Sequence, residues 1–207
     1  MLRPVGRFVR RRLGAAGRRR REVFMFAAAM QHRTRPVLAQ IVPIRRCNLT
    51  CTYCNEFDHS SEPVPVAQML KRVDKLASLG ASIITISGGE PLLHPQLDDI
   101  IRRIRARDAI ATLISNAYPL SRERIRALND AGLDYLQISI DNVEPDETSM
   151  KSLRVLERKL GWLAQEAEFA ITMRLIAWTF LDNPFAGRLR GAVARLFGLR
   201  PAKSPLK

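Results

Sequence analysis

The 207-residue sequence predicts an α/β fold, a partial (β/α) TIM-like barrel in which about five βα units are visible. Strand-like and helix-like patterns alternate five times with short connections, which is typical of βα units on a parallel sheet. The strand-like runs are apolar enough to be buried on both faces. A complete (β/α)8 barrel needs about 250 residues, so we expect an open or partial barrel.

The expected elements follow in regular order. Apolar, β-branched runs predict strands over residues 37–44, 82–86, 110–114, 135–140 and 169–173. Helical periodicity predicts helices over residues 66–79 and 97–106, a third between Ser121 and Gly132, and a fourth from Ser149 or Ser152 to about residue 164. Gly80 stands where a helix-ending glycine is expected, and Ser121 where a helix N-cap is expected.

The net charge of +14 lies at the two ends of the chain. Residues 1–35 hold 11 arginines against a single acid, Glu22, and residues 174–207 carry a further excess of basic residues. We therefore expect a basic, disordered N-terminal extension (1–35), a globular core (36–173) and a basic C-terminal tail of unassigned structure (174–207). A basic surface confined to the ends does not predict specific nucleic-acid binding by the core, and no apolar run is long enough to span a membrane.

The three cysteines, Cys47, Cys51 and Cys54, form one cluster with the spacing Cys-x3-Cys-x2-Cys. An odd number of thiols so close together is a poor disulfide framework. Thiolates at this spacing suit metal or iron–sulfur ligation, and three of them would leave one iron of a four-iron cluster open to an outside ligand. The alternative is a structural zinc site, for which His59 would supply a fourth ligand.

A second motif, Ser87-Gly88-Gly89-Glu90-Pro91, directly follows a predicted strand. Adjacent glycines there let the backbone approach a ligand closely, and the Glu90 carboxylate suits an ammonium group. Other polar residues end the next two predicted strands: Ser115 and Asn116 the third, Ser139 and Asp141 the fourth. Active sites of such folds lie where the strands end, so we expect one shared rim.

With both motifs present, the sequence resembles the radical S-adenosylmethionine (SAM) superfamily over roughly residues 37–173, near the molybdenum-cofactor cyclases and peptide maturases. The resemblance implies that Cys47, Cys51 and Cys54 bind a [4Fe–4S] cluster. It implies SAM contacts for the following residues: Gly88, Gly89, Glu90, Ser115, Asn116, Ser139 and Asp141. The reduced cluster would cleave SAM to a 5′-deoxyadenosyl radical that abstracts hydrogen from an unknown substrate. A donor such as flavodoxin or ferredoxin would supply the electron, in the cytoplasm.

The two ends depart from the family pattern. In residues 1–35, arginine clusters beside a short apolar stretch resemble a signal or transit peptide, but we favour a disordered tail or a start at Met25 or Met30. After Met173 the composition changes abruptly and no sixth strand is visible, which favours a truncation or frameshift. The alternatives to a radical SAM enzyme are therefore a non-catalytic remnant that binds an iron–sulfur cluster, or a zinc-binding interaction module.

Overall fold

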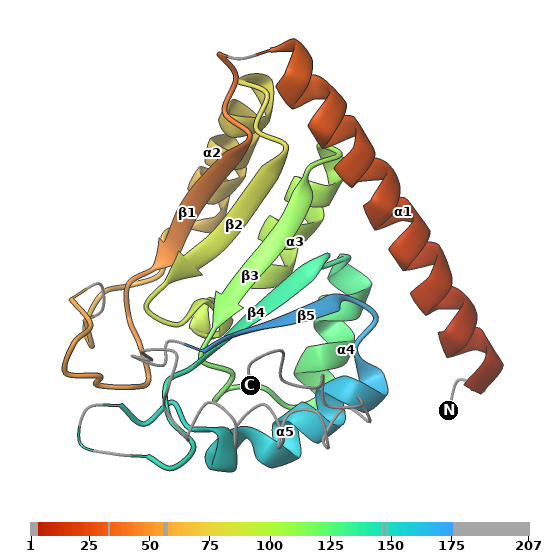
Figure 1. Ribbon diagram of the computed structural model, residues 1–207. Helices are drawn as coiled ribbons and strands as arrows, with labels where there is room; N and C mark the ends of the chain where they lie inside the picture. The colour runs from red at the N-terminus through yellow and green to blue at the C-terminus, as the bar shows by residue number, and fades with distance from the viewer. Residues whose placement is uncertain (1–3, 33, 56–57, 146, 148, 176–207) are drawn as a thin grey trace, which may run out of the picture.

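The structure is a computed structural model, which describes residues 4–32, 34–55, 58–145, 147 and 149–175. Its elements alternate between strands and helices after a long first helix (Figure 1). The strands are β1 (Leu38–Ile44), β2 (Ile83–Gly88), β3 (Ile110–Ser115), β4 (Tyr135–Ile140) and β5 (Ala170–Leu175). The helices are α1 (Pro4–Gln31), α2 (Val66–Ser78), α3 (Leu97–Ala106), α4 (Arg122–Ala131) and α5 (Leu153–Glu166), with a short 3-10 helix η1 (Pro91–Leu93).

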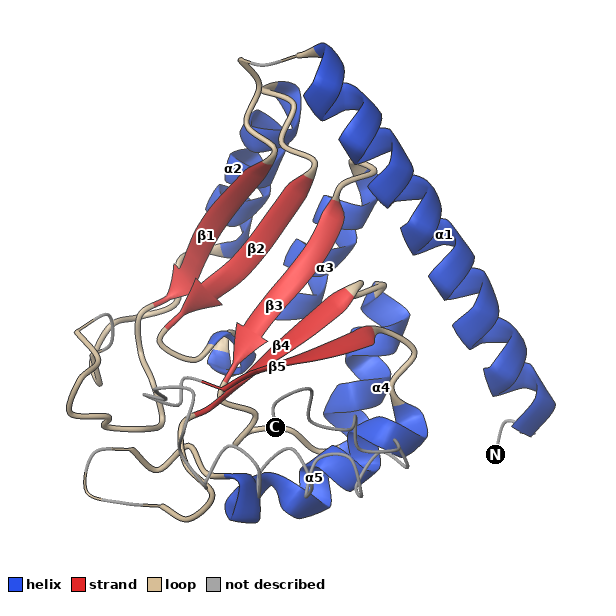
Figure 2. Ribbon diagram, in the orientation of Figure 1, coloured by secondary structure: helices blue, strands red, loops and turns tan. Residues whose placement is uncertain are grey.

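The five strands form one parallel sheet in the order β1-β2-β3-β4-β5. Each strand pairs with the next along the chain, and the intervening helices α2 to α5 lie on one side of the curved sheet (Figure 2). This arrangement confirms the predicted partial (β/α) barrel. All five strands end at the same edge, where the polar residues of the sequence motifs follow them.

The core lies between the sheet and helices α2 to α5. Alternate residues of the strands, such as Ile84, Ile86 and Leu136, are fully buried, as are Val73 of α2 and Ile100 of α3. Burying each side chain of this size contributes roughly 1.5–3 kcal/mol. Burial of the apolar side chains that recur periodically in the sequence therefore stabilises the packing of the helices on the sheet.

The capping residues predicted from the sequence lie at the ends of helices in the structure. The Ser121 hydroxyl accepts a hydrogen bond from the Arg124 amide at 3.1 Å and caps α4. Gly80 after α2 and Gly132 after α4 have φ values of +91° and +84°, which favour glycine. Ser152 precedes α5 without a side-chain capping bond. Sequence reasoning did not predict η1.

The structure corrects the expectation that residues 1–35 are disordered, because Pro4–Gln31 form the 28-residue helix α1. This helix crosses the edge where β3, β4 and β5 begin (Figure 1). Arg21 pairs with Asp134 at 2.5 Å, with both side chains almost fully buried, and Tyr135 donates a hydrogen bond to Glu22. The local pattern predicts only a solvated tail because the partners of these arginines lie far along the chain, 88 residues away for Arg20 and 113 for Arg21.

The C-terminal tail predicted over residues 174–207 lies almost wholly outside the described residues, which end with β5 at Leu175. Among the described helices, none is long and apolar enough to cross a membrane.

Candidate functional site

The cysteine loop leaves the end of β1 and is closed at its base by Asp58. The Cys47 amide donates to the Asp58 carbonyl at 3.1 Å, and the Asp58 amide donates to the Arg45 carbonyl at 3.2 Å. The Asp58 carboxylate accepts bonds from the Ser61 hydroxyl and from the amides of Ser61 and Ser60, which together lower the pKa of this partly exposed group. Asp58 therefore shapes the loop and is not free to face a substrate.

The two glycines after β2 lie directly against the start of this loop. The Gly89 amide donates to the Ile44 carbonyl at 3.1 Å, and the Glu90 amide to the Arg46 carbonyl at 3.0 Å. A Cβ atom on Gly89 would lie 2.1 Å from the Arg45 carbonyl oxygen, and one on Gly88 would lie 2.3 Å from that of Ile44. The sequence suggested close approach to a ligand; the structure shows that the glycines first permit close approach between two backbone segments.

Glu90 is fully buried beneath the rim. Its carboxylate accepts hydrogen bonds from the Leu92 amide at 3.0 Å, the Ser115 hydroxyl at 2.8 Å and the Asn116 amide at 2.8 Å. Burial nevertheless dominates and raises the pKa of Glu90 to about 7. This carboxylate therefore joins three parts of the rim through the protein's own donors, and its contact with the SAM ammonium group stays a prediction.

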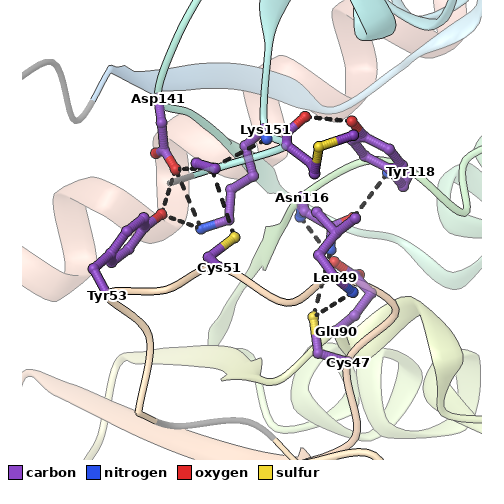
Figure 3. Close-up of polar contacts among 11 residues, drawn as sticks. Cys47, Leu49, Cys51, Tyr53, Glu90, Asn116, Tyr118, Asp141 and Lys151 are labelled. Carbon is purple, nitrogen blue, oxygen red and sulfur yellow. Dashed lines mark hydrogen bonds and ion pairs between the residues drawn. The ribbon is translucent and has the colours of Figure 1, made fainter. Parts of the chain in front are cut away.

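Asn116 connects the loop after β3 to the first cysteine (Figure 3). Its Nδ2 lies 3.7 Å from the Cys47 Sγ and 2.9 Å from the Asn48 Oδ1. The next residue, Ala117, has φ +63°, and its amide donates to the Ser115 hydroxyl. The tight turn places the Asn116 side chain over the cysteine loop.

A cavity of about 160 Å³ opens at this rim. Most of the expected site residues line it: Cys47, Cys51, Cys54, Gly88, Gly89, Ser115, Asn116 and Ser139. Glu90 and Asp141 are absent from its lining, and so is His59. The predicted residues that line the cavity therefore come from the carboxyl ends of four strands, β1 to β4. Glu90 and Asp141 lie outside this lining.

Sequence reasoning missed Ser149 and Lys151, which lie between β4 and α5. Lys151 also lines the cavity. Its Nζ donates to the Tyr53 hydroxyl at 2.7 Å and lies 3.8 Å from the Asp141 Oδ2. The Ser149 hydroxyl donates to the same Asp141 oxygen at 2.5 Å and lies 3.6 Å from the Cys51 Sγ. The sequence signal that could have indicated these two residues is the polar segment 141–152, which follows the carboxyl end of β4.

This network places a cation beside the cysteines. The pKa of Lys151 is raised: burial lowers it, but the Tyr53 hydroxyl and the Asp141 carboxylate together outweigh that effect. The other carboxylate oxygen of Asp141, Oδ1, is buried without a hydrogen-bond partner among the described residues. The pocket wall thus presents a charged ammonium group that a bound anion can reach.

All three thiols line the cavity, and Cys51 is the buried one. Burial raises the pKa of the Cys47 thiol, and the Leu49 amide, 3.4 Å from the sulfur, opposes that shift. Within the described residues, no three His, Cys, Asp or Glu side chains are grouped closely enough to hold one metal ion. A cluster binds each cysteine through a different iron, so its ligands stand farther apart than those of a single zinc.

The parallel α/β fold with a cysteine loop at its carboxyl rim defines a class of cofactor-dependent barrel proteins. A family model for the radical SAM superfamily matches residues 41–165. The chain belongs to this superfamily, whose members use a [4Fe–4S] cluster and SAM. The cofactors expected from the sequence are therefore those of the family.

Individual relatives agree with this assignment. The chain is 36% identical over 102 residues to the PqqA peptide cyclase of Methylocella silvestris, covering 48% of this chain and 27% of that protein. It is 35% identical over 105 residues to the GTP 3′,8-cyclase of Chlorobaculum tepidum, covering 49% and 32%. The matches thus span about a third or less of these curated relatives.

Solved structures show the same fold. SuiB of Streptococcus suis, bound to S-adenosylmethionine, superposes with a TM-score of 0.66 at 13% identity, covering 86% of this chain and 44% of that one. BtrN in complex with AdoMet and 2-DOIA gives a TM-score of 0.52 at 19% identity, covering 67% and 56%. At these identities the likeness concerns the fold alone.

Proposed function

We propose that this chain is a radical SAM enzyme that reductively cleaves SAM and passes a hydrogen-abstracting radical to a substrate. The observation that carries the proposal is the convergence of three thiols, two glycines and five polar side chains on one cavity at the carboxyl edge of the sheet. Family membership supports the same reaction.

Cys47, Cys51 and Cys54 would hold the cluster, and the cavity they line would receive SAM. A [4Fe–4S] cluster held there, once reduced by an outside donor, would supply the one electron needed to split the sulfonium C–S bond of SAM into methionine and a 5′-deoxyadenosyl radical. The protein orients the reacting groups and excludes water. Asn116, in contact with the Cys47 sulfur, would hold that ligand in place.

The other residues around the cavity would each contribute differently to SAM binding. The Gly88-Gly89 backbone and the side chains of Ser115 and Ser139 line the cavity and would contact its polar groups. Lys151 would pair with the methionine carboxylate, since its ammonium group reaches the cavity and is charged at neutral pH. Asp141 would orient Lys151 from behind, while Glu90 holds the loops that carry Ser115 and Asn116.

A second cavity, of about 390 Å³, adjoins the first at Gly88 and is lined by Gln40, Val42, Arg45 and Asn55. It is the place we assign to the substrate, whose chemical class is open. We further propose a small cytoplasmic protein such as flavodoxin or ferredoxin as the electron donor. We also propose residues 36–173 as the catalytic core. The last strand, β5, continues to Leu175, and α1 packs against this core from the segment before it.

The test is anaerobic reconstitution of the full chain with iron and sulfide, followed by reduction with dithionite in the presence of SAM. We expect formation of 5′-deoxyadenosine, and its loss in Cys51→Ala. The matched control is Ser78→Ala, a surface change at the end of α2. A bound cluster without SAM cleavage would favour the non-catalytic remnant, and retention of zinc without iron would favour the zinc-binding module.

A further inference from the structure

Asn116 is a buried residue whose side-chain amide is aimed at one of the three thiols. The residue is only 4% exposed, and both polar atoms of its side chain are bonded. Its Oδ1 accepts a hydrogen bond from the Tyr118 amide at 2.9 Å. Its Nδ2 donates to the Asn48 Oδ1 at 2.9 Å and to the Cys47 Sγ at 3.7 Å (Figure 3). One amide group therefore joins the loop after β3 to the first cysteine.

These bonds fix which end of the Asn116 amide faces the sulfur. If the amide were turned over, its oxygen would lie against the Asn48 oxygen and the Cys47 sulfur, so that acceptors would meet acceptors. The NH2 group would at the same time lie against the N–H of Tyr118, so that two donors would meet. The N–H donor is therefore held on the sulfur by hydrogen bonds that do not involve the sulfur itself.

The Cys47 sulfur also receives a second N–H donor, since the Leu49 amide lies 3.4 Å away. The situation at Cys51 differs. The Ser149 hydroxyl lies 3.6 Å from the Cys51 sulfur, but it directs its single proton to the Asp141 carboxylate, 2.5 Å away. Cys47 thus has one donor from its own loop and one from the loop after β3.

We propose that Asn116 is a positioning residue that raises the reduction potential of the cluster through its hydrogen bond to Cys47. The inference rests on the proposed function, in which the three thiols that line the cavity ligate a [4Fe–4S] cluster. Reduction adds one negative charge, which the cysteine sulfurs share, and N–H donors to those sulfurs stabilise that charge. The bond from Asn116 would therefore make the cluster easier to reduce.

A purely structural role for Asn116 predicts a different result. Its bonds to Asn48 and Tyr118 also hold two loops together, so their loss alone would lower stability without shifting the potential. Asn129 of α4 offers a matched comparison, because its Oδ1 accepts from the Glu168 amide at 2.8 Å and its Nδ2 donates to the Glu166 carbonyl at 2.9 Å. Asn129 makes the same kind of bridge but does not line the cavity.

The test is a redox titration of the full chain, reconstituted anaerobically with iron and sulfide and followed by electron paramagnetic resonance without SAM. Asn116→Ala should shift the equilibrium toward the oxidised cluster by about tenfold, which is about 59 mV for one electron. Asn116→Asp keeps the acceptor for Tyr118 but replaces the donor by a negative charge, so its potential should be lower still. Asn129→Asp should lower stability and leave the potential unchanged.

Iron and sulfide analysis with circular dichroism shows whether each variant folds and holds a cluster. The inference is overturned if Asn116→Ala keeps the wild-type potential, even where Asn116→Asp lowers it, because the added charge would then account for the shift. It is also overturned if neither Asn116 variant holds a cluster, which would make the role structural. Both of these results leave the proposed function intact, whereas a wild-type chain that takes up no cluster overturns the two together.

Discussion

The Asn116 amide donates a 2.8 Å hydrogen bond to the buried carboxylate of Glu90. This bond joins the loop after β3 to the glycine motif after β2, and the Ser115 hydroxyl makes a parallel connection to the other carboxylate oxygen. Two adjacent loops of the rim therefore share one ionisable group that solvent does not reach.

The first prediction concerns the pH dependence of stability. Burial raises the pKa of Glu90 from 4.5 to about 7, so the folded state keeps a proton that the unfolded state releases. The contribution of Glu90 to the free energy of unfolding should therefore be largest below pH 4.5 and should be lost as the pH rises to about 7. Urea unfolding of the wild type and of Glu90→Gln at several pH values between 4.5 and about 7 measures the part of this pH dependence that is due to Glu90.

The free energy of unfolding of Glu90→Gln should depend less on pH than that of the wild type, because the variant has no carboxyl group to titrate here. It should also be lower overall, because the new side-chain NH2 group would lie against a donor such as the Asn116 amide. Glu62→Gln, an exposed carboxylate in the same part of the chain, is the control and should reproduce the wild-type profile. Identical slopes for Glu90→Gln and the wild type would contradict the prediction.

The second prediction concerns the attachment of α1. Asp134 accepts a bond from the Ala111 amide at 3.0 Å and pairs with both Arg21 and Arg105, at 2.5 and 3.3 Å. Asp134→Ala should lower the free energy of unfolding by about 3–5 kcal/mol, because it leaves buried positive charge without its partner. Thermal or urea unfolding measures this loss.

The control for that change lies four residues away. Asp130 pairs with Arg10 at 3.0 Å, but both side chains are largely exposed. Asp130→Ala should therefore cost no more than about 1 kcal/mol. Equal losses for the two variants would show that α1 is not held by the buried pair.

The third prediction compares two identical substitutions of glycine. Gly89→Ala places a Cβ atom 2.1 Å from the Arg45 carbonyl oxygen and 2.4 Å from that of Arg46, so the cysteine loop must move. We expect the reconstituted variant to retain less than about a tenth of the iron and of the SAM cleavage. Iron and sulfide analysis together with the 5′-deoxyadenosine assay measures both.

Gly161→Ala is the matched change within α5, where a new Cβ atom meets nothing within 4 Å. Replacing glycine by alanine inside a helix stabilises it by about 0.5–1 kcal/mol, so iron content should be unchanged and the melting temperature slightly higher. Full iron content in Gly89→Ala would contradict the packing argument.

The fourth prediction rests on the proposed role of Lys151. Lys151→Met keeps the length of the side chain but removes the ammonium group that reaches the cavity. The KM for SAM should rise by roughly tenfold or more, as expected for the loss of a charged hydrogen-bonding partner worth about 1.5–3 kcal/mol, with a smaller change in kcat. Steady-state kinetics of SAM cleavage separates the two.

Lys71→Met, an exposed lysine on α2, serves as the control and should leave both constants unchanged. If Lys151→Met alters kcat and KM for SAM as little as Lys71→Met does, Lys151 does not bind SAM.

Most strands and helices were predictable because their apolar periodicity is local. The boundaries of α3 and β4 match the prediction to the residue, and those of β1, β3 and α2 to within one residue. Local patterns also placed the glycine motif and Ser115 at strand ends. Lys151 escaped prediction because its partners are distant in sequence: Tyr53 lies in the cysteine loop, and Asp141 stands ten residues earlier in the connection between β4 and α5.

By itself, the sequence determined the order of the βα units, the rim on which polar residues gather, and the superfamily that its cysteine and glycine motifs indicate. Only the tertiary structure decided what each of these residues contacts. It directs Glu90 inward, uses the glycines to join two backbone segments, and turns an arginine-rich segment into a docked helix. The physical reason is that periodicity and capping act between neighbours in sequence, whereas burial and charge pairing depend on partners that folding brings together.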